Sequence, residues 1–338
     1  MSTVDGWHQR VPKVELHLHL EGAIPLPAMW ELIRKYGGDP DVPDEAALAR
    51  RFTYVDFPHF IDTWIWKNQF LRELDDFTLI ARHCARALVT DNVHYAEMFY
   101  SPTPFVGLGL PVDEVTAAIR RGLDTVPEVR VQLICDLVRN LGPEREAPTV
   151  EAVIDLQELG VVGIGLGGLE QGFPPEPFAP LYERARQAGL HTNAHAGENA
   201  GPKSVWGALE TLRAERIGHG TRCVEDPRLL KFLADHAVHL EVCPTSNLCT
   251  GVVDDLRQHP ARTFLEHGIP FSISTDDPAM FNTTMAQEYR IAEDVLGFDR
   301  ATLCTLAATA IGASWLDDLD KASVLNRMKA HPDWVEDA

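Results

Sequence analysis

The sequence has few basic side chains for its acidic content. Its 338 residues include 30 Lys and Arg against 50 Asp and Glu, which gives a formal net charge of −20. The Lys and Arg residues form no cluster that would offset this charge locally. Nucleic acids, anionic membranes and polyphosphate ligands would meet net repulsion, so we expect neither a nucleic acid nor a membrane as partner.

Long hydrophobic runs and closely spaced cysteines are also missing. No apolar segment approaches the ~18 residues that a membrane-spanning helix needs, and the first residues, MSTVDGWHQR, contain no apolar core typical of a secretory signal. The six cysteines are scattered and most lie in apolar stretches, so we expect reduced, buried thiols in a cytoplasmic protein. With 45% hydrophobic and 24% charged residues, the composition excludes a disordered, collagen-like or coiled-coil chain.

Short apolar segments alternate with longer amphipathic segments along the chain. The apolar segments, which we expect to be strands, cover 14–20, 94–100, 131–138, 161–167, 191–196, 216–219, 238–243 and 271–275. Helical periodicity marks 149–159, 178–188, 203–213 and 227–236 between them. Eight strand–helix units predict a single α/β domain over residues 1–338, a (β/α)8 TIM barrel, with an open doubly wound sheet as the alternative.

The connection between the first two expected strands is too long for a single crossover helix. It contains three segments with helical character, 26–36, 44–52 and 57–71. We expect a helical insertion at about 24–75 that lies over the mouth of the barrel, as a lid that excludes water from a pocket.

Histidines and carboxylates stand at the ends of four expected strands. His17 and His19 alternate with leucines, so their imidazoles share one face of the first strand. The other strand-end residues are His195 with Glu198 in the following loop, His219 between two glycines, and Asp276 with Asp277. Each motif alone has an ordinary explanation, such as exposed histidines or an Asp-Asp-Pro turn. In a closed barrel, however, all of them meet at the carboxyl ends of the strands, where barrel enzymes carry their chemistry.

Three histidines and one carboxylate form a ligand set that suits Zn²⁺ and leaves a coordination position for water. A bound cation lowers the pKa of that water, so the site predicts hydrolytic attack on an sp² carbon or a phosphorus. Glu198 is then a candidate proton donor, and His219 is a candidate for orienting or deprotonating the water. No lysine occurs between Lys67 and Lys203. Because two-metal barrel hydrolases usually bridge their metals with a carbamylated lysine on the fourth strand, we expect one metal per chain.

Five motifs follow one another along the chain. They are PKVELHLHLEG at 12–22, HAGE at 195–198, GHG at 218–220, CPTSN at 243–247 and STDDP at 274–278. Together they resemble the adenosine/adenine deaminase family of the amidohydrolase superfamily, and the resemblance runs from about residue 11 to residue 320. It implies a hydrolase that removes the amino group of a 6-aminopurine.

The resemblance also implies a role for individual residues. It implies that one Zn²⁺ is held by His17, His19, His195 and Asp276. It implies that Glu198 protonates ring N1, while His219 and Asp276 position hydroxide for attack at C6, after which ammonia leaves. Asp277 would accept a hydrogen bond at N7, the backbone of Gly168 would lie near N3, and His19 and Glu21 would meet the substrate.

The motifs point to different substrates within this family. Nucleoside deaminases usually carry Asp where this chain has Glu21, whereas Glu resembles the adenine deaminases. The GHG, CPTSN and TDD motifs instead resemble the nucleoside branch. Gly165 and Leu169 replace acidic residues that many members have, so we expect a differently shaped loop after the fourth strand.

The segment FPHFIDTW at 57–64 aligns with the helix that covers the ribose in this family. Phe57, Phe60, Ile61 and Trp64 fall on one helical face, either as a wall at the 5′ side of a nucleoside or as packing against the barrel rim. We therefore expect deamination of adenosine or of a 5′-modified adenosine such as aminodeoxyfutalosine. The alternatives are adenine deamination, a two-metal phosphoester or lactone hydrolase, and a purine-binding protein without catalysis. The sequence does not indicate an oligomeric state.

Overall fold

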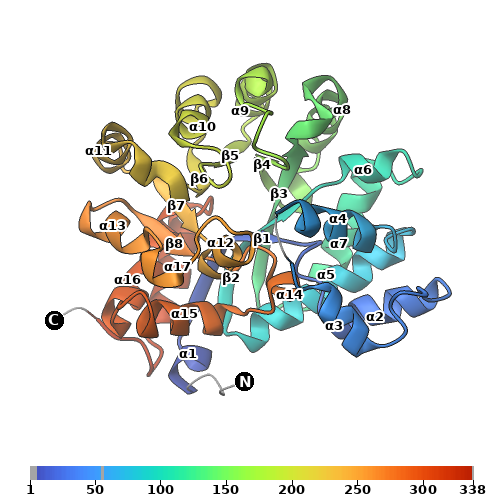
Figure 1. Ribbon diagram of the computed structural model, residues 1–338, viewed down its shortest axis with the longest axis horizontal. Coiled ribbons are helices and arrows are strands. Elements are labelled where there is room, and N and C mark those ends of the chain that lie inside the picture. The colour runs from blue at the N-terminus through green and yellow to red at the C-terminus, as the bar shows by residue number, and fades with distance from the viewer. Residues whose placement is uncertain (1–5, 55–56, 337–338) are drawn as a thin grey trace.

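Eight parallel strands form the centre of the molecule. The computed structural model describes residues 6–54 and 57–336, except for the side chain of Phe57. The strands pair in chain order and helices surround them (Figure 1). They are β1 (Lys13–His19), β2 (Val93–Tyr100), β3 (Arg130–Val138), β4 (Val161–Gly167), β5 (His191–Ala196), β6 (Arg216–His219), β7 (His239–Val242) and β8 (Phe271–Ile273). This sequential order confirms the (β/α)8 barrel and excludes the open doubly wound sheet, in which the strand order reverses.

The barrel closes between its last and first strands just beyond the end of β8. The backbone N–H of His19 donates to the carbonyl oxygen of Asp276 at 2.9 Å, and the N–H of Asp276 donates to the carbonyl oxygen of His17 at 3.0 Å. Strand β8 is shorter than the expected 271–275 because the chain turns at Asp276, whose φ is 65°. The other strand bounds match the predicted ranges to within one residue.

Helices fill most connections between the strands. Outside the β1–β2 connection they are α1 (Gly6–Arg10), α6 (Thr103–Val106), α7 (Val112–Leu123), α8 (Pro143–Ile154), α9 (Ala179–Gln187), α10 (Pro202–Gly207), α11 (Pro227–Asp235), α12 (Pro244–Cys249), α13 (Ala261–Glu266), α14 (Pro278–Phe281), α15 (Met285–Asp294), α16 (Arg300–Ala313) and α17 (Asp318–Lys329). Helix α8 begins earlier than the expected 149–159, because Pro143 occupies its first turn, where no N–H partner is needed. The expected helix 203–213 is divided into α10 and a π-helical turn, Ala208–Leu212.

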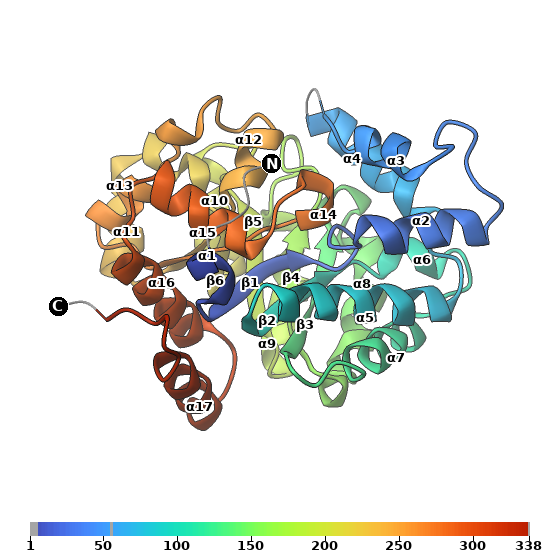
Figure 2. The ribbon, with the colours of Figure 1, turned by 90° about the horizontal axis from the view of Figure 1, so that it is seen from below.

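In the described part of the β1–β2 connection there are four helices: α2 (Leu26–Lys35), α3 (Glu45–Arg51), α4 (Phe57–Asn68) and α5 (Leu74–Thr90). Helix α5 packs against α7 and β2, so it is the crossover helix of this unit. Helices α2 to α4 are additional to the barrel plan, and Figure 2 shows them on the side of the molecule away from α17. Their role as a lid remains a prediction.

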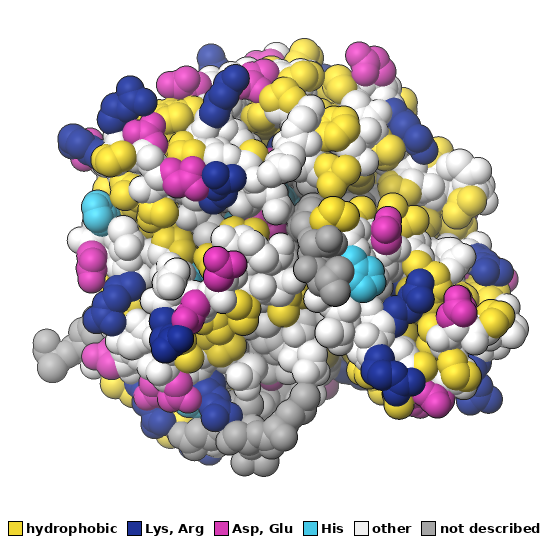
Figure 3. All heavy atoms as spheres, in the orientation of Figure 1, with side chains coloured by type: hydrophobic (Ala, Val, Ile, Leu, Met, Phe, Trp, Pro, Cys, Tyr) yellow, Lys and Arg dark blue, Asp and Glu magenta, His cyan; other side chains and the backbone are white. Residues whose placement is uncertain are grey.

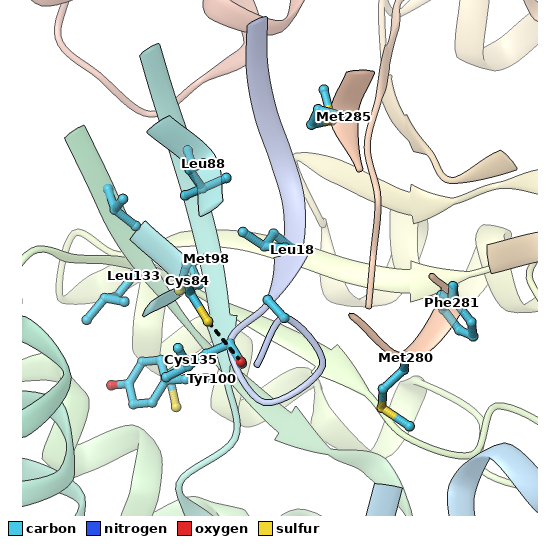
Figure 4. Packing of buried hydrophobic residues seen from close by; sticks show 14 of the residues in the cluster. Leu18, Cys84, Leu88, Met98, Tyr100, Leu133, Cys135, Met280, Phe281 and Met285 are labelled. Carbon is cyan, nitrogen blue, oxygen red and sulfur yellow. Dashed lines mark hydrogen bonds between the residues drawn. The ribbon is translucent and has the colours of Figure 1, made fainter. Parts of the chain in front are cut away.

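The layer between strands and helices is apolar. Leu18 of β1 and Leu88 of α5 are buried in the same cluster, and the thiol of Cys84 donates a hydrogen bond to the carbonyl oxygen of Leu20 at 3.7 Å (Figure 4). All six cysteines are unpaired and five of them are buried, as the sequence predicts. Among residues 6–54 and 57–336, no helix combines the length and the apolar character needed to cross a bilayer. Acidic and basic side chains are intermixed on the face drawn in Figure 3.

The barrel interior also contains a buried ionic network. The guanidinium of Arg216 lies 2.5 Å from a carboxylate oxygen of Glu97 and 2.8 Å from one of Glu241. All three side chains are at most 2% exposed, and the guanidinium also lies 3.7 Å from the centre of the Trp315 ring. A buried charge is tolerated only when it is paired, so the two carboxylates depend on this one cation.

We predict that Arg216→Met lowers the free energy of unfolding by about 3–5 kcal/mol, because it leaves Glu97 and Glu241 buried without their cation. Urea unfolding followed by circular dichroism measures the change. Arg257→Met is the matched control, because Arg257 pairs with Asp255 on the surface and its side chain is 78% exposed. A variant R216M as stable as the control would contradict this account of the network.

Candidate active site

The four expected metal ligands meet at the carboxyl end of the barrel. The Nε2 atom of His19 lies 3.0 Å from Nε2 of His195 and 3.3 Å from Oδ1 of Asp276. The Nε2 atom of His17 lies 3.6 Å from the same Oδ1. Ligand atoms at about 2.0–2.2 Å from a tetrahedral Zn²⁺ are separated by about 3.3–3.6 Å, so the two spacings to Asp276 fit one such ion and the spacing between His19 and His195 is slightly shorter. Among the described residues, Nε2 of His17 is buried without a hydrogen-bond partner, as expected of a donor atom reserved for a ligand.

Glu241 of β7 fixes the orientation of His17. Its Oε2 lies 2.7 Å from Nδ1 of His17, and its Oε1 accepts a hydrogen bond from the side-chain amide of Asn193 at 2.9 Å. Burial alone would raise the pKa of Glu241, but Arg216 and His17 outweigh burial and hold the pKa below its usual value. An ionised Glu241 accepts the Nδ1 proton of His17, so Nε2 is the ring nitrogen that faces the ligand cluster and would coordinate a cation in place of its proton.

His219 adjoins this cluster, and its ring nitrogen lies within 4.8 Å of donor atoms of His17, His195 and Asp276. Its Nε2 is 4.0 Å from Oδ2 of Asp276 and 3.8 Å from Oε2 of Glu198. Oδ1 of Asp276 faces His17 and His19, whereas Oδ2 accepts a hydrogen bond from the hydroxyl of Ser246 at 2.6 Å. His219 and Asp276 both have positive φ angles, 62° and 65°, a strained conformation for residues other than glycine that is common at functional sites.

The hydrogen bonds of Asn247 define the proton position on His219. The side-chain oxygen of Asn247 accepts from the Thr221 hydroxyl at 2.7 Å and lies 3.1 Å from Nε2 of His259. Its amide nitrogen therefore donates to Nδ1 of His219, at 3.3 Å. Burial lowers the pKa of His219 to about 4, although the charge of Asp276 acts to raise it. A neutral His219 that accepts at Nδ1 carries its proton on Nε2, facing Glu198 and Asp276.

Glu198 is held by the loop that follows β5. The carboxylate of Glu170 accepts hydrogen bonds from the backbone N–H groups of four consecutive residues, 197–200, at 2.6–3.1 Å. The Glu198 side chain is 10% exposed. Burial, followed by the charge of Asp276, raises the pKa of Glu198 well above its usual value. Its carboxyl group is therefore suited to hold a proton at neutral pH and to donate it.

Asp136 of β3 occupies space that opens because position 165 is a glycine. A Cβ atom on Gly165 would lie 2.6 Å from Oδ1 of Asp136, and one on Gly167 would lie 2.2 Å from Oδ2. Asp136, His19 and His195 also have side-chain atoms close enough to hold an ion together. However, Asp136 lies 4.0 Å from Nδ1 of His195, the ring nitrogen opposite the Nε2 that faces His19. The two atoms are too far apart for a hydrogen bond, and both are buried without a partner among the described residues. Asp136 occupies space that a side chain at position 165 would need.

A cavity of about 290 Å³ opens above the ligand cluster. Its lining includes nearly all of the expected substrate contacts among the described side chains: His19, Phe60, Ile61, Trp64, Gly168 and Asp277. The side chain of Phe57 lies outside the described part of the chain. Phe60 also stacks on Phe281, so this residue serves both the cavity wall and packing at the rim. Glu21 is 1% exposed and lies behind the wall, where its Oε1 accepts from the backbone N–H of Ser101 at 3.0 Å.

Sequence reasoning missed Glu241, Asp136, Glu170 and Asn247. The only signal for Glu241 and Asp136 is a carboxylate on the inward-facing side of an apolar strand, in 239–242 and 130–138. Such a residue reveals its partner only when the neighbouring strands are in place. Glu170, in the loop after β4, gives no comparable signal. Asn247 of α12 belongs to the CPTSN motif, from which no role for its side chain was inferred.

Comparison with known proteins places the chain among purine deaminases. The family model described as "Adenosine deaminase" matches residues 12–331. The aminodeoxyfutalosine deaminase of Streptomyces avermitilis is 39% identical over 327 residues, covering 93% of this chain and 89% of that protein. The adenine deaminase of Cupriavidus metallidurans is 34% identical (94% and 90% covered), and the adenosine deaminase of Shewanella denitrificans is 33% identical (93% and 97% covered).

Solved structures give the same result. The adenine deaminase from Arthrobacter aurescens superposes with a TM-score of 0.88 at 31% identity, covering 94% of this chain and 98% of that one. An amidohydrolase from Burkholderia ambifaria with bound Zn has a TM-score of 0.87 at 27% identity (98% and 95% covered). Arabidopsis ADAL in complex with GMP has a TM-score of 0.87 at 26% identity (97% and 99% covered). The family expected from the sequence motifs is therefore confirmed: the chain belongs to the adenosine deaminase family.

Proposed function

We propose that this chain is a zinc-dependent aminohydrolase that converts a 6-aminopurine nucleoside to the 6-oxopurine and ammonia. The observation that carries the proposal is the convergence of His17, His19, His195 and Asp276 at the base of a cavity, beside the buried carboxyl of Glu198. Hydrolysis at C6 needs an activated water and a proton donor on the same side of the cavity.

The four ligand residues would hold one Zn²⁺ per chain. When bound, this ion lowers the pKa of a coordinated water towards ~7 and makes hydroxide available. The spacing of the four donor atoms supports this ion, as does the orientation of His17 by Glu241. A second metal would need further bridging ligands, and the lysine-free stretch between Lys67 and Lys203 argues against the two-metal hydrolase.

Glu198 and Asp277 would recognise and activate the purine ring. Glu198 holds a proton because its pKa is raised, and it donates that proton to N1, which makes C6 more electrophilic. Asp277 must donate at N7, the reverse of the direction expected from the sequence, because N7 of a neutral purine carries no hydrogen. Burial and the charge of Asp276 raise the pKa of Asp277 well above its usual value, which supports this donation. Gly168, with φ of 84°, brings backbone rather than a side chain to the N3 edge.

His219 would orient the attacking water instead of deprotonating it. With Nδ1 occupied by the amide of Asn247, a neutral His219 has a hydrogen-bond donor at Nε2 and no free lone pair there. Oδ2 of Asp276, 4.0 Å away, is the nearby carboxylate oxygen that can accept a proton from the water. Of the two roles expected for His219, the geometry supports orientation.

The cavity wall supports a nucleoside without a charged 5′ group. Phe60, Ile61 and Trp64 make one wall apolar, and none of the described residues that line the cavity is Lys or Arg. A 5′-phosphate would therefore meet carboxylates without a compensating cation. Adenosine and 5′-modified adenosines remain the proposed substrates, and adenine is the second candidate because Glu21 resembles the adenine deaminases.

We predict turnover of a nucleoside in a screen of adenine, adenosine, deoxyadenosine, methylthioadenosine, aminodeoxyfutalosine and AMP, with AMP not turned over. Loss of the adenine absorbance band and release of ammonia measure the reaction. Glu198→Gln keeps the size of the side chain but removes the acid, so it should lower kcat by roughly 10²–10⁴-fold. Absence of turnover with every purine in the screen would refute the proposed function.

We predict that Glu241→Gln weakens zinc binding by roughly 10–100-fold, because a neutral amide holds the Nδ1 proton of His17 less strongly. Competition with a chromophoric chelator measures the affinity, and elemental analysis gives the zinc content per chain. Glu97→Gln is the matched control, since Glu97 also contacts Arg216 but does not touch His17. Equal zinc affinities of E241Q and E97Q would contradict the role assigned to Glu241.

We predict that Glu21→Asp shifts the ratio of kcat/KM values from adenine towards adenosine, because a shorter side chain behind the wall would let the wall recede and leave room for the sugar. Side-by-side kinetics on the two substrates measure the ratio. A ratio that does not change would show that Glu21 does not control access of the sugar.

A further inference from the structure

Lys67 is a buried cation on α4, the helix that supplies the apolar wall of the cavity. Lys67 is 1% exposed. Its Nζ donates to the carbonyl oxygen of Glu21 at 2.5 Å and to the side-chain oxygen of Asn68 at 2.9 Å. The ammonium also lies 4.2 Å from the centre of the Trp64 ring. Burying an ammonium is costly, and an apolar residue would serve better if α4 needed only to pack against the rim.

The backbone that Lys67 holds is in direct contact with Asp277. A Cβ atom at Gly22 would lie 1.6 Å from Oδ1 of Asp277, so only a glycine allows the carboxyl group to occupy its position. The carbonyl oxygen of Gly22 accepts a hydrogen bond from the N–H of Ala279 at 3.2 Å, which joins this turn to the loop after β8. A shift of the 21–22 backbone would therefore displace the Asp277 carboxyl.

Two carboxylate oxygens in this region have no partner among the described residues. They are Oε2 of Glu21 and Oδ1 of Asp277, and both are buried. Buried polar atoms are nearly always hydrogen-bonded, and Asp277 lines the cavity, so its unpartnered carboxyl oxygen indicates a group that a ligand satisfies. Glu21 does not line the cavity. Lys67 interacts electrostatically with both carboxyl groups, and burial lowers its own pKa to about 8 against their attraction. Because the field of Lys67 favours the ionised form of Asp277 and is outweighed there by burial and the charge of Asp276, the contribution of Lys67 to this carboxyl group is the backbone that it holds.

We propose that Lys67 is a positioning residue that couples the seating of α4 to the Asp277 carboxyl, and hence to recognition of N7 of the purine. This inference rests on the proposed function. The helix that forms the sugar-side wall and the group that reads the base are then connected by one side chain, through Glu21 and Gly22. Lys67 itself lies behind the wall and does not touch the substrate.

The test compares substrates that do or do not have N7. The kcat/KM for adenosine is divided by that for 7-deazaadenosine, and the kcat/KM for adenine by that for 7-deazaadenine. For whichever of these two substrate pairs the wild-type protein prefers, the ratio should be roughly tenfold or more. This corresponds to the loss of one hydrogen bond to a buried partner. Asp277→Ala gives the ratio that remains when the N7 contact is lost.

Lys67→Met should reduce this ratio towards the D277A value while retaining zinc, measured by elemental analysis. The matched control is Trp66→Phe, which removes a different attachment of α4, the hydrogen bond from Trp66 to Asp39 at 2.9 Å, and should keep the wild-type ratio. If K67M does not fold, Lys67→Gln, which is shorter and uncharged, should lower the ratio in the same direction.

A wild-type ratio in K67M, or an equal loss in W66F, would overturn the inference. Equal wild-type rates with and without N7 would also overturn it, while leaving deamination itself in place. Failure of the wild-type protein to deaminate any purine would instead refute the proposed function, so the two failures are distinguishable.

Discussion

The two backbone hydrogen bonds between Asp276 and the end of β1 are the constraint on which both the barrel and its site depend. They close the ring of strands, and they join the residues that carry three of the four proposed metal ligands. His17 and His19 reach the cluster because they lie one strand away from Asp276, and His195 reaches it from β5 on the other side of the ring. A ligand set drawn from distant parts of the chain is thus brought together by closure of the barrel.

Buried charge organises the interior around this cluster. Arg216 balances the charges of Glu97 and Glu241 inside the barrel. Glu241 in turn fixes the orientation of His17. Near the mouth, Glu198 and Asp277 are placed where burial and the charge of Asp276 favour their protonated forms. The same low-dielectric interior therefore keeps one set of carboxyl groups ionised, beside cations, and another set neutral, beside an anion.

Much of this organisation could be predicted from the sequence, because it depends on local patterns. Alternation of apolar and polar residues located the strands to within one or two residues, and strand-end positions identified His17, His19, His195 and Asp276 as a group. The supporting residues were not predictable, because Glu241 of β7 acts on His17 of β1 and Asp136 of β3 lies beside His195 of β5. Partners on strands that are not adjacent become evident only when the whole barrel is in place. The reaction at C6 was inferred from the resemblance to a known family. The direction of the hydrogen bond at N7 was inferred instead from the absence of a hydrogen on that ring atom and from the environment of Asp277.

The hydrogen bonds of the Glu170 carboxylate bear on how readily the proton-donating residue at position 198 could be replaced. Four amide groups converge on it, so the path of the chain through 197–200 is set without help from the side chain at 198. The residue that holds the loop therefore differs from the residue that donates the proton. A different side chain could stand at position 198 on the same rigid turn, and the barrel could acquire a new proton-transfer chemistry without a change in the loop.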